Sequence, residues 1–185
     1  MIRSLLIRFR RDRRGVSAVE FALIAPLLIS TYFALAVLSG AMMAERKASH
    51  VASAIGDLVA QSTVLHDADF TDIFSIANTV MAPFDTTSTA LKMRVSSIGQ
   101  DANGAVKVLW SKPQNMTALV QGTTYTGLPA GLISNGQTII LSEVTYTYNS
   151  PVSSFVQSII PNALTFTEHF YLKPRQSDSV TALTP

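Results

Sequence analysis

The longest apolar run of the chain lies near its N-terminus. No charged residue occurs from Phe21 to Ala44, and twenty-four residues at about 1.5 Å of helical rise per residue make a helix about 36 Å long. The apolar core of a bilayer is about 30 Å thick, so such a helix can cross it with some tilt. The pattern predicts a transmembrane helix over residues 16–44.

Beyond this run, apolar residues recur every three or four positions in two stretches, which is typical of amphipathic helices. Residues 45–62 predict a continuation of the first helix, with an apolar face made of Ala48, Val51, Ala52, Ile55, Leu58 and Val59. Residues 67–85 predict a second helix that ends at Pro83. Its apolar face consists of Phe70, Ile73, Phe74, Ala77, Val80 and Met81. We expect the second helix to fold back against the first.

From residue 90 the hydrophobic period falls to two, which is typical of half-buried strands. Residues 91–98 alternate in this way, residues 99–105 supply turn residues, and the alternation resumes with Val106, Val108 and Trp110 on one face. This pattern predicts an antiparallel hairpin.

Two more strands are predicted at residues 137–149 and 164–172, because both stretches are rich in β-branched and aromatic residues. Residues 112–136 are rich in Gly, Pro, Asn and Thr and predict an irregular connection with one helical turn at 115–120. Residues 155–160 are expected to form a short helix or an edge segment.

Together these elements predict an α+β fold, in which a long N-terminal helix packs on a small, mainly antiparallel four-stranded sheet. The expected divisions of the chain are a basic leader (1–15), a transmembrane helix (16–44), a helical continuation with a second helix (45–89), an antiparallel β domain (90–173) and a loose C-terminal tail (174–185).

Positive charge is concentrated before the apolar run. The six arginines there are Arg3, Arg8, Arg10, Arg11, Arg13 and Arg14. Because Lys and Arg beside a spanning helix tend to stay in the cytoplasm, we expect a single-pass inner-membrane protein with its N-terminus inside and its C-terminal domain exported to the periplasm. The rest of the chain has eight Lys and Arg against eleven Asp and Glu, so no nucleic-acid partner is expected.

The chain does not display the usual signs of an enzyme. The histidines His50, His66 and His169 are far apart, and the common motifs of metalloproteases, serine hydrolases and phosphate loops are absent. We therefore expect no catalytic activity, no cofactor, no metal and no small-molecule substrate. The three acids Asp67, Asp69 and Asp72 lack the glycine and distal glutamate of a calcium loop, and the favourable effect of acids at a helix start explains them better.

Three aromatic residues of the predicted sheet could serve either adhesion or the core. Strand alternation favours burial of Trp110. For Tyr146 and Tyr148, which share a face with Val144, exposure and burial both fit the pattern.

One acidic residue, Glu20, lies at the start of the apolar run. A carboxylate at membrane depth is costly and usually has a partner, which makes it a functional candidate. Its position fits equally well a side chain that reaches the headgroup level.

The residues around Glu20 resemble a known signal. In GVSAVEFALIAPLLI a glycine follows the basic leader and a glutamate stands at the fifth position after it, which is similar to the cleavage and assembly signal of type IV prepilins. More narrowly, RRGVSAVEFALIAPLL resembles the TadE-like family, which includes minor pseudopilins of the bacterial tight-adherence (Tad) pilus. Later segments also look similar to that family, namely VASAIGDLVAQS, MAPFD, VLWS, SEVTYTY and YLKPR.

The resemblance implies roles for three residues. A prepilin peptidase would cut after Gly15 and leave Val16 as the new N-terminus. Glu20 would pair with the free N-terminal amine of a neighbouring subunit during assembly. Implied partners are this peptidase, other pilins and pseudopilins of the Tad system, the inner-membrane platform and the lipid bilayer. The implied function is pilus biogenesis and surface adherence.

Two further residues refine this resemblance. Major pilins of the system usually have Tyr after the glutamate, whereas this chain has Phe21, which fits a minor subunit better. Pro26 lies inside the predicted spanning helix and lacks the N–H that would bond to the carbonyl of Ala22. It predicts a kink, although membrane helices also tolerate proline without such a role.

Two other classes of protein share some of these features. A cleaved secretory signal would fit the arginines and the Ala34–Ala36 stretch, but its apolar region spans only about 7 to 15 residues. An uncleaved signal anchor that carries a periplasmic interaction domain remains the alternative. It predicts that replacement of Glu20 leaves function intact.

Overall fold

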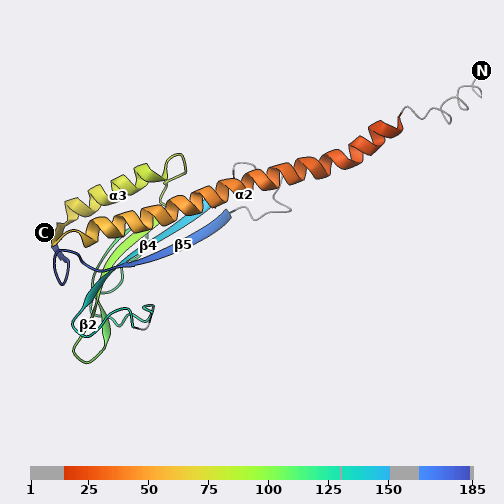
Figure 1. Ribbon diagram of the computed structural model, residues 1–185. Helices are drawn as coiled ribbons and strands as arrows, with labels where there is room; N and C mark the ends of the chain where they lie inside the picture. Colours follow the sequence, from red (N-terminus) through yellow and green to blue (C-terminus); the bar gives the residue numbers. More distant parts are fainter. Residues whose placement is uncertain (1–14, 130, 151–162, 184–185) are drawn as a thin grey trace, which may run out of the picture.

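The computed structural model describes residues 15–129, 131–150 and 163–183. A single long helix extends across the whole molecule, and a small α+β domain packs against its C-terminal half (Figure 1). The elements in chain order are α2 (Val16–Ala60), β1 (Val64–His66), α3 (Asp67–Met81), β2 (Leu91–Gln100), β3 (Val106–Gln114), β4 (Thr138–Asn149), β5 (Ala163–Leu172) and β6 (Thr181–Leu183). The predicted α+β fold is confirmed.

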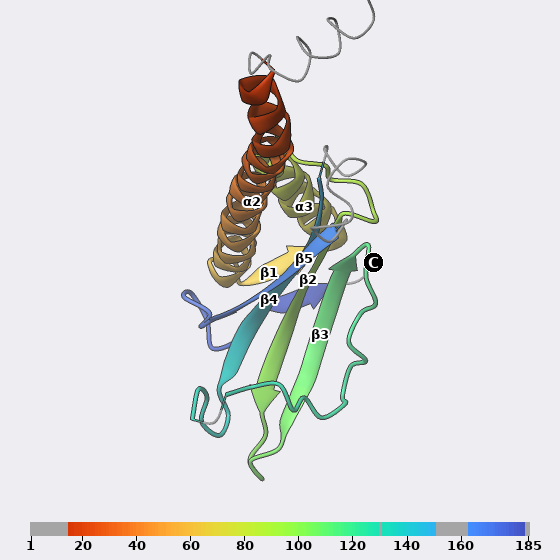
Figure 2. The same cartoon turned by 90° about the vertical axis from the view of Figure 1, so that its right-hand side faces the viewer.

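The main sheet has four antiparallel strands in the order β3-β2-β4-β5. The predicted hairpin is β2 and β3, and the two later strands are β4 and β5. Figure 2 shows both helices on one side of this sheet, with β3 at the edge farthest from α2. A second, two-stranded parallel sheet joins β1 to β6.

The C-terminal half of α2 crosses the sheet at close range because two of its residues are glycines. A Cβ atom on Gly56 would lie 2.5 Å from Leu172 Cδ1 and 3.1 Å from Ser142 Cβ. Gly40 lies against the ring of Tyr148 in the same way. Since Tyr148 pairs with Leu164 and Leu172 ends β5, β5 runs alongside α2 in the same direction, and β4 runs back.

Helix α3 lies beside α2, as predicted (Figure 1). Its apolar face is buried through Phe70, Ile73, Phe74, Ala77 and Met81. At its start the backbone N–H of His66 donates to Asp69 Oδ2 at 2.7 Å. Asp67 and Asp69 both lie in the first turn of α3, which supports their interpretation as helix-start residues. At its end Lys47 Nζ donates to the carbonyl of Val80 at 3.1 Å and also to that of Ala82, which ties α3 to α2.

The core fills the space between the helices and the sheet. Tyr146 and Tyr148, whose exposure the sequence left open, belong to this core at 1% and 8% exposure. The ring of Phe84 packs edge-on against both of them, at centroid distances of 6.3 and 6.1 Å. Trp110 is half-buried and packs edge-on against Phe70 at 5.5 Å.

A bulge in β3 corrects the predicted face of the hairpin. Ser97 pairs with Trp110, whereas the next residue, Ile98, pairs with Val108, so β3 contains one extra residue. As a result Val106 packs on a second small core with Ile98 on the face away from the helices, while Trp110 packs toward the helices. The expectation of one shared face was wrong because a bulge reverses the alternation.

The C-terminal tail is not the loose end that the sequence suggested. Strand β6 pairs in parallel with β1, Val180 is 2% exposed, and Arg175 Nη2 forms an ion pair with Asp57 Oδ1 at 2.5 Å. Three residues are too few for the periodicity of a strand to be recognised, so the sequence pattern missed both β1 and β6.

The sequence also made two smaller predictions for the connecting segments. The helical turn expected at residues 115–120 is absent, since residues 115 and 116 form a bend and residues 117–120 have no regular secondary structure. The segment 155–160, expected to be a short helix or an edge segment, lies outside the described residues.

Candidate functional site

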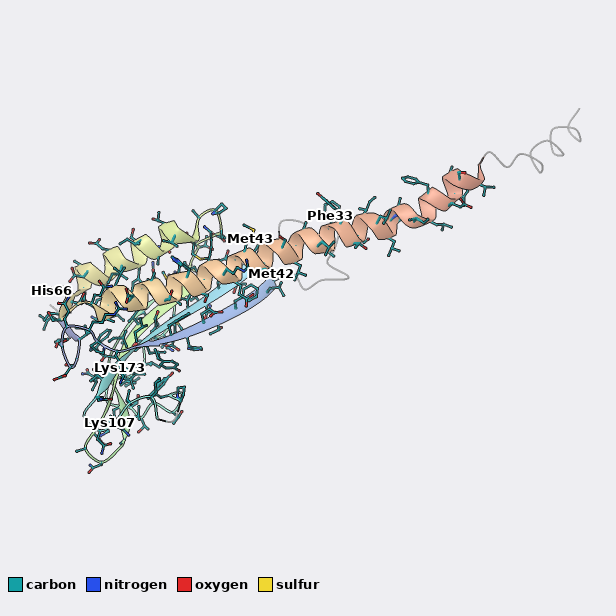
Figure 3. The ribbon with its side chains drawn as sticks, in the orientation of Figure 1. Phe33, Met42, Met43, His66, Lys107 and Lys173 are labelled. Atoms are coloured by element: carbon teal, nitrogen blue, oxygen red, sulfur yellow. The ribbon has the colours of Figure 1, made fainter. Side chains whose placement is uncertain are left out.

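The N-terminal half of α2 projects away from the domain. No residue from 15 to 36 is buried, and the first buried residue is Val37, at 4% exposure. Figure 3 shows the side chains of this half pointing into open space on all sides, with Phe33, Met42 and Met43 near the point where the domain begins. The 21 residues from 16 to 36 make about 32 Å of helix, close to the thickness of a bilayer core.

The domain begins to cover α2 inside the predicted transmembrane segment. Val37, Ala41 and Ala44 are buried by the domain, so one face of α2 is already covered by protein inside the predicted span of 16–44. The helix is long and apolar enough to cross a membrane, and the part available to lipid on every side ends before Val37.

Glu20 lies in the exposed half, one helical turn after Val16. No hydrogen bond or ion pair joins its carboxylate to any of the described residues. A charged group at the edge of an apolar helix, without a partner among the described residues, fits a group that finds its partner in another molecule.

Gly15 forms the N-cap of α2, and the Val19 N–H donates to its carbonyl at 3.1 Å. Its φ of −84° lies in the region that every residue adopts, and a Cβ atom there would meet nothing within 4 Å. The fold therefore does not require glycine at this position. A requirement for glycine would have to come from a molecule that acts on the chain.

Pro26 lies inside α2, and the helix continues through it (Figure 1). The missing N–H deprives the carbonyl of Ala22 of its usual donor. One turn later, Ser30 Oγ donates to the carbonyl of Pro26 at 2.7 Å and Thr31 Oγ1 donates to that of Leu27 at 2.9 Å. These two hydrogen bonds satisfy the hydroxyl groups of Ser30 and Thr31, for which lipid offers no acceptor.

The domain contains a cluster of charged and polar side chains. On the sheet face away from the helices, Arg94 Nε donates to Glu143 Oε2 at 2.6 Å, and His169 Nδ1 lies 3.4 Å from Glu143 Oε1. Arg94 Nη1 also donates to the carbonyl of Thr117 at 2.7 Å. Within the described residues, no group of His, Asp and Glu side chains is arranged to hold a metal ion.

Burial raises the pKa of two tyrosines in the domain. The pKa of Tyr125 is raised first by burial and then by a hydrogen bond with Tyr171. Burial is also the first cause that raises the pKa of Tyr146, followed by the negative charge of Asp85. Both shifts favour the neutral phenol at physiological pH, which fits packing residues.

The family model described as TadE-like protein matches residues 15–56. Residues 15–56 are TadE-like. The match begins at Gly15, includes the whole exposed half of α2, and ends at Gly56, where the helix touches the sheet. The resemblance inferred from the sequence is thus confirmed for the helix. No curated protein and no solved structure matches the chain.

The TadE-like segment suggests an association with the Tad pilus. The segments from Met81 onward that also looked similar to the family lie outside the match. A single N-terminal apolar helix is consistent with single-pass anchoring in a membrane.

The structure brings three of the four predicted site residues together. Gly15, Val16 and Glu20 lie within the first turns of α2, and Pro26 lies further along the same helix. The sequence reasoning missed the two close contacts of α2 with the sheet, at Gly40 and Gly56. The small side chains on the buried face of α2 were the available signal, since only small residues allow such an approach.

Proposed function

We propose that this chain is a minor pseudopilin of a bacterial Tad pilus, which supports pilus biogenesis and surface adherence. A prepilin peptidase removes residues 1–15, the helix from Val16 anchors the chain in the inner membrane, and Glu20 pairs with the N-terminal amine of a neighbouring pilin or pseudopilin. The observation that carries the proposal is the Glu20 carboxylate, which has no partner among the described residues. It lies one turn after the Gly15–Val16 bond, on a helix half in which no described residue is buried.

Electrostatics supports the role of Glu20. Cleavage after Gly15 would place an ammonium group at Val16, and opposite charges attract far more strongly in an apolar environment than in water. An unpaired charge in lipid is costly, whereas a paired and hydrogen-bonded one is much less so. Pairing between subunits would therefore align the helices in register.

The geometry of Gly15 supports processing. The cleavage bond lies at the very start of α2, outside every packed region, so a peptidase could reach it without unfolding the domain. Because nothing in the fold requires glycine there, the residue would serve recognition by the enzyme. The arginines before it would hold this end in the cytoplasm, with the domain in the periplasm and, after assembly, in the pilus.

The test compares two substitutions in the exposed half of α2. Glu20→Ala should abolish incorporation of the chain into sheared pili, while membrane insertion, domain stability and cleavage after Gly15 stay unchanged. Ser17→Ala, a change in the same turn without loss of charge, should assemble normally. The measurement is immunodetection of the chain in pilus and membrane fractions of the same cells.

One observation favours a second function. Because Glu20 lies at the exposed end of the helix, its carboxylate can also reach the headgroups, as in an uncleaved anchor that carries a periplasmic interaction domain. In that case Glu20→Ala retains function and residues 1–15 stay attached.

A further inference from the structure

The two edges of the main sheet differ in how they are protected. An edge strand presents unpaired N–H and C=O groups and invites another strand, so proteins commonly shield it with bulges, prolines, lysines or a covering loop. Edge strand β3 carries all four devices. It has the bulge next to Trp110, Pro113 and two lysines, and a loop residue covers it where the Val108 N–H donates to the Thr123 carbonyl at 3.0 Å.

The opposite edge strand, β5, has none of these four devices. Its one charged residue on the face toward α2 is Glu168, which lies opposite Val144. Its ten residues pair with β4 in an unbroken register, and it contains neither proline nor lysine. Among the described residues, no backbone hydrogen bond reaches β5 from its outer side. At about 3.3 Å per residue, this leaves about 33 Å of open edge.

The apolar side chains of β5 on the face toward α2 are also less well covered than those of β4. On the face toward α2, β4 buries Ile140, Val144 and Tyr146 at 0 to 1% exposure. The same face of β5 carries four large apolar residues that are only half-buried, and they are Leu164, Phe166, Phe170 and Leu172. A further strand with apolar residues on this face would cover them, as β5 itself covers β4.

We propose that the open edge of β5 accepts an extended strand from a different subunit that is anchored in the same membrane. The added strand alternates apolar residues, facing α2, with polar residues beside the threonines on the other face of β5. This inference goes beyond the proposed function, since it concerns the domain and not the Glu20 contact.

The direction of β5 argues against a second copy of the chain as the partner. The usual symmetric contact between two edge strands is a two-fold, antiparallel pair. Because β5 runs in the same direction as α2, that pairing would place the two α2 helices antiparallel. Two identical chains inserted in the same way in one membrane cannot adopt this arrangement.

The area of the contact argues for a membrane-anchored partner. A stable interface buries more than about 1,000 Å², which a single short strand does not supply alone. The β5 edge is continuous with the exposed half of α2, since Leu164 borders an apolar groove shared with Leu35, Val37 and Leu38. A partner that also contributes an apolar helix can contact both surfaces.

Hydrogen exchange at single-residue resolution tests the proposal on the full chain. We expect alternate amides of residues 163–172, about half of them, to become protected in native membranes that contain the pilus proteins, relative to the purified chain in lipid vesicles. Amides of residues 109–114 on the β3 edge should not change. If these amides of β5 are already protected in vesicles that contain only the purified chain, the edge binds a second copy of the chain. That result would overturn the proposal of a different subunit as the partner. Unchanged exchange of β5 in both samples would overturn the site itself.

A pair of matched variants tests the same contact without loss of the fold. Thr165 and Thr167 lie on β5 and are exposed, and their cross-strand neighbours on β4 are Thr147 and Thr145. The double variant Thr165→Lys, Thr167→Lys should lose the alternate protection, because lysines block edge pairing. The double variant Thr145→Lys, Thr147→Lys should keep it, and equal loss in both would contradict the proposal. The Glu20→Ala outcome is independent of these variants, so the two proposals fail separately.

Discussion

The two halves of α2 differ in how strongly packing against the domain constrains their amino-acid sequence. From residue 37 to 60 the helix has a buried face, made of small and β-branched side chains, that fits the sheet. From residue 15 to 36 no residue is buried, so the fold constrains little beyond helix formation. The described part of the fold thus gives no reason for specific residues in the exposed half, such as Gly15 and Glu20. Those in the packed half are explained by the domain.

The largest expected contrast comes from the same substitution in each half. Ile55 is 1% exposed and Ile29 is 46% exposed. Ile55→Ala should lower the free energy of unfolding by about 2 to 5 kcal/mol, because it leaves a cavity in the core. Ile29→Ala should change it by less than about 0.5 kcal/mol. Thermal unfolding of the full chain in detergent measures both variants. Equal losses of unfolding free energy would contradict the proposed difference between the two halves.

A glycine pair gives the next contrast. Gly56→Ala places a methyl group in contact with Leu172 and Ser142 and should cost about 1 to 3 kcal/mol through overpacking. Gly15→Ala meets nothing and should leave stability unchanged while it slows removal of the leader. Unfolding curves and the fraction of cleaved chain report the two effects. A stable Gly56→Ala chain would show that the helix can shift away from the sheet.

The attachment of the C-terminal tail predicts a more local effect. Trp110 Nε1 donates to the carbonyl of Val180 at 2.7 Å. Trp110→Phe keeps an aromatic ring against Phe70 but leaves this buried carbonyl without a donor, at a cost of about 1 to 3 kcal/mol. Faster hydrogen exchange in residues 180–183, with little change in α3, is the expected result. Uniformly faster exchange throughout the domain would instead indicate a general loss of packing.

The smallest expected effect is a dependence of stability on pH. The hydrogen bond from Lys107, followed by that from the Ala105 N–H, holds the pKa of Asp101 below its usual value. A carboxyl group with a lowered folded pKa contributes stability above its unfolded pKa, about 3.9, and loses that contribution as the pH falls through the folded pKa. The difference in melting temperature between the wild type and Asp101→Asn should shrink from pH 7 to pH 3. A constant difference would contradict this role.

The sequence predicted most of the architecture because the period of its apolar residues is clear. Both helices, the four long strands and the α+β fold follow from periods of three to four and of two. The bulge in β3 could not be predicted, since one extra residue reverses the alternation without a change in composition. Strands β1 and β6 are too short for a period, and they pair across more than a hundred residues of sequence.

The candidate site could be predicted from motif spacing, whereas its boundary could not. The positions of Gly15 and Glu20 relative to the apolar run are visible in the sequence alone. The point where the domain begins to cover α2 depends on where Tyr148 meets Gly40, which is a tertiary contact. The apolar run continues past that point, so hydropathy alone does not show where the domain begins to cover the helix.

The most direct test of the account is the N-terminus of the chain in membranes of cells that have a prepilin peptidase. Mass measurement of the intact membrane form should give a chain that begins at Val16, which leaves a free amine one turn from Glu20. A chain that still begins at Met1 would remove the amine, and with it the proposed pairing between subunits.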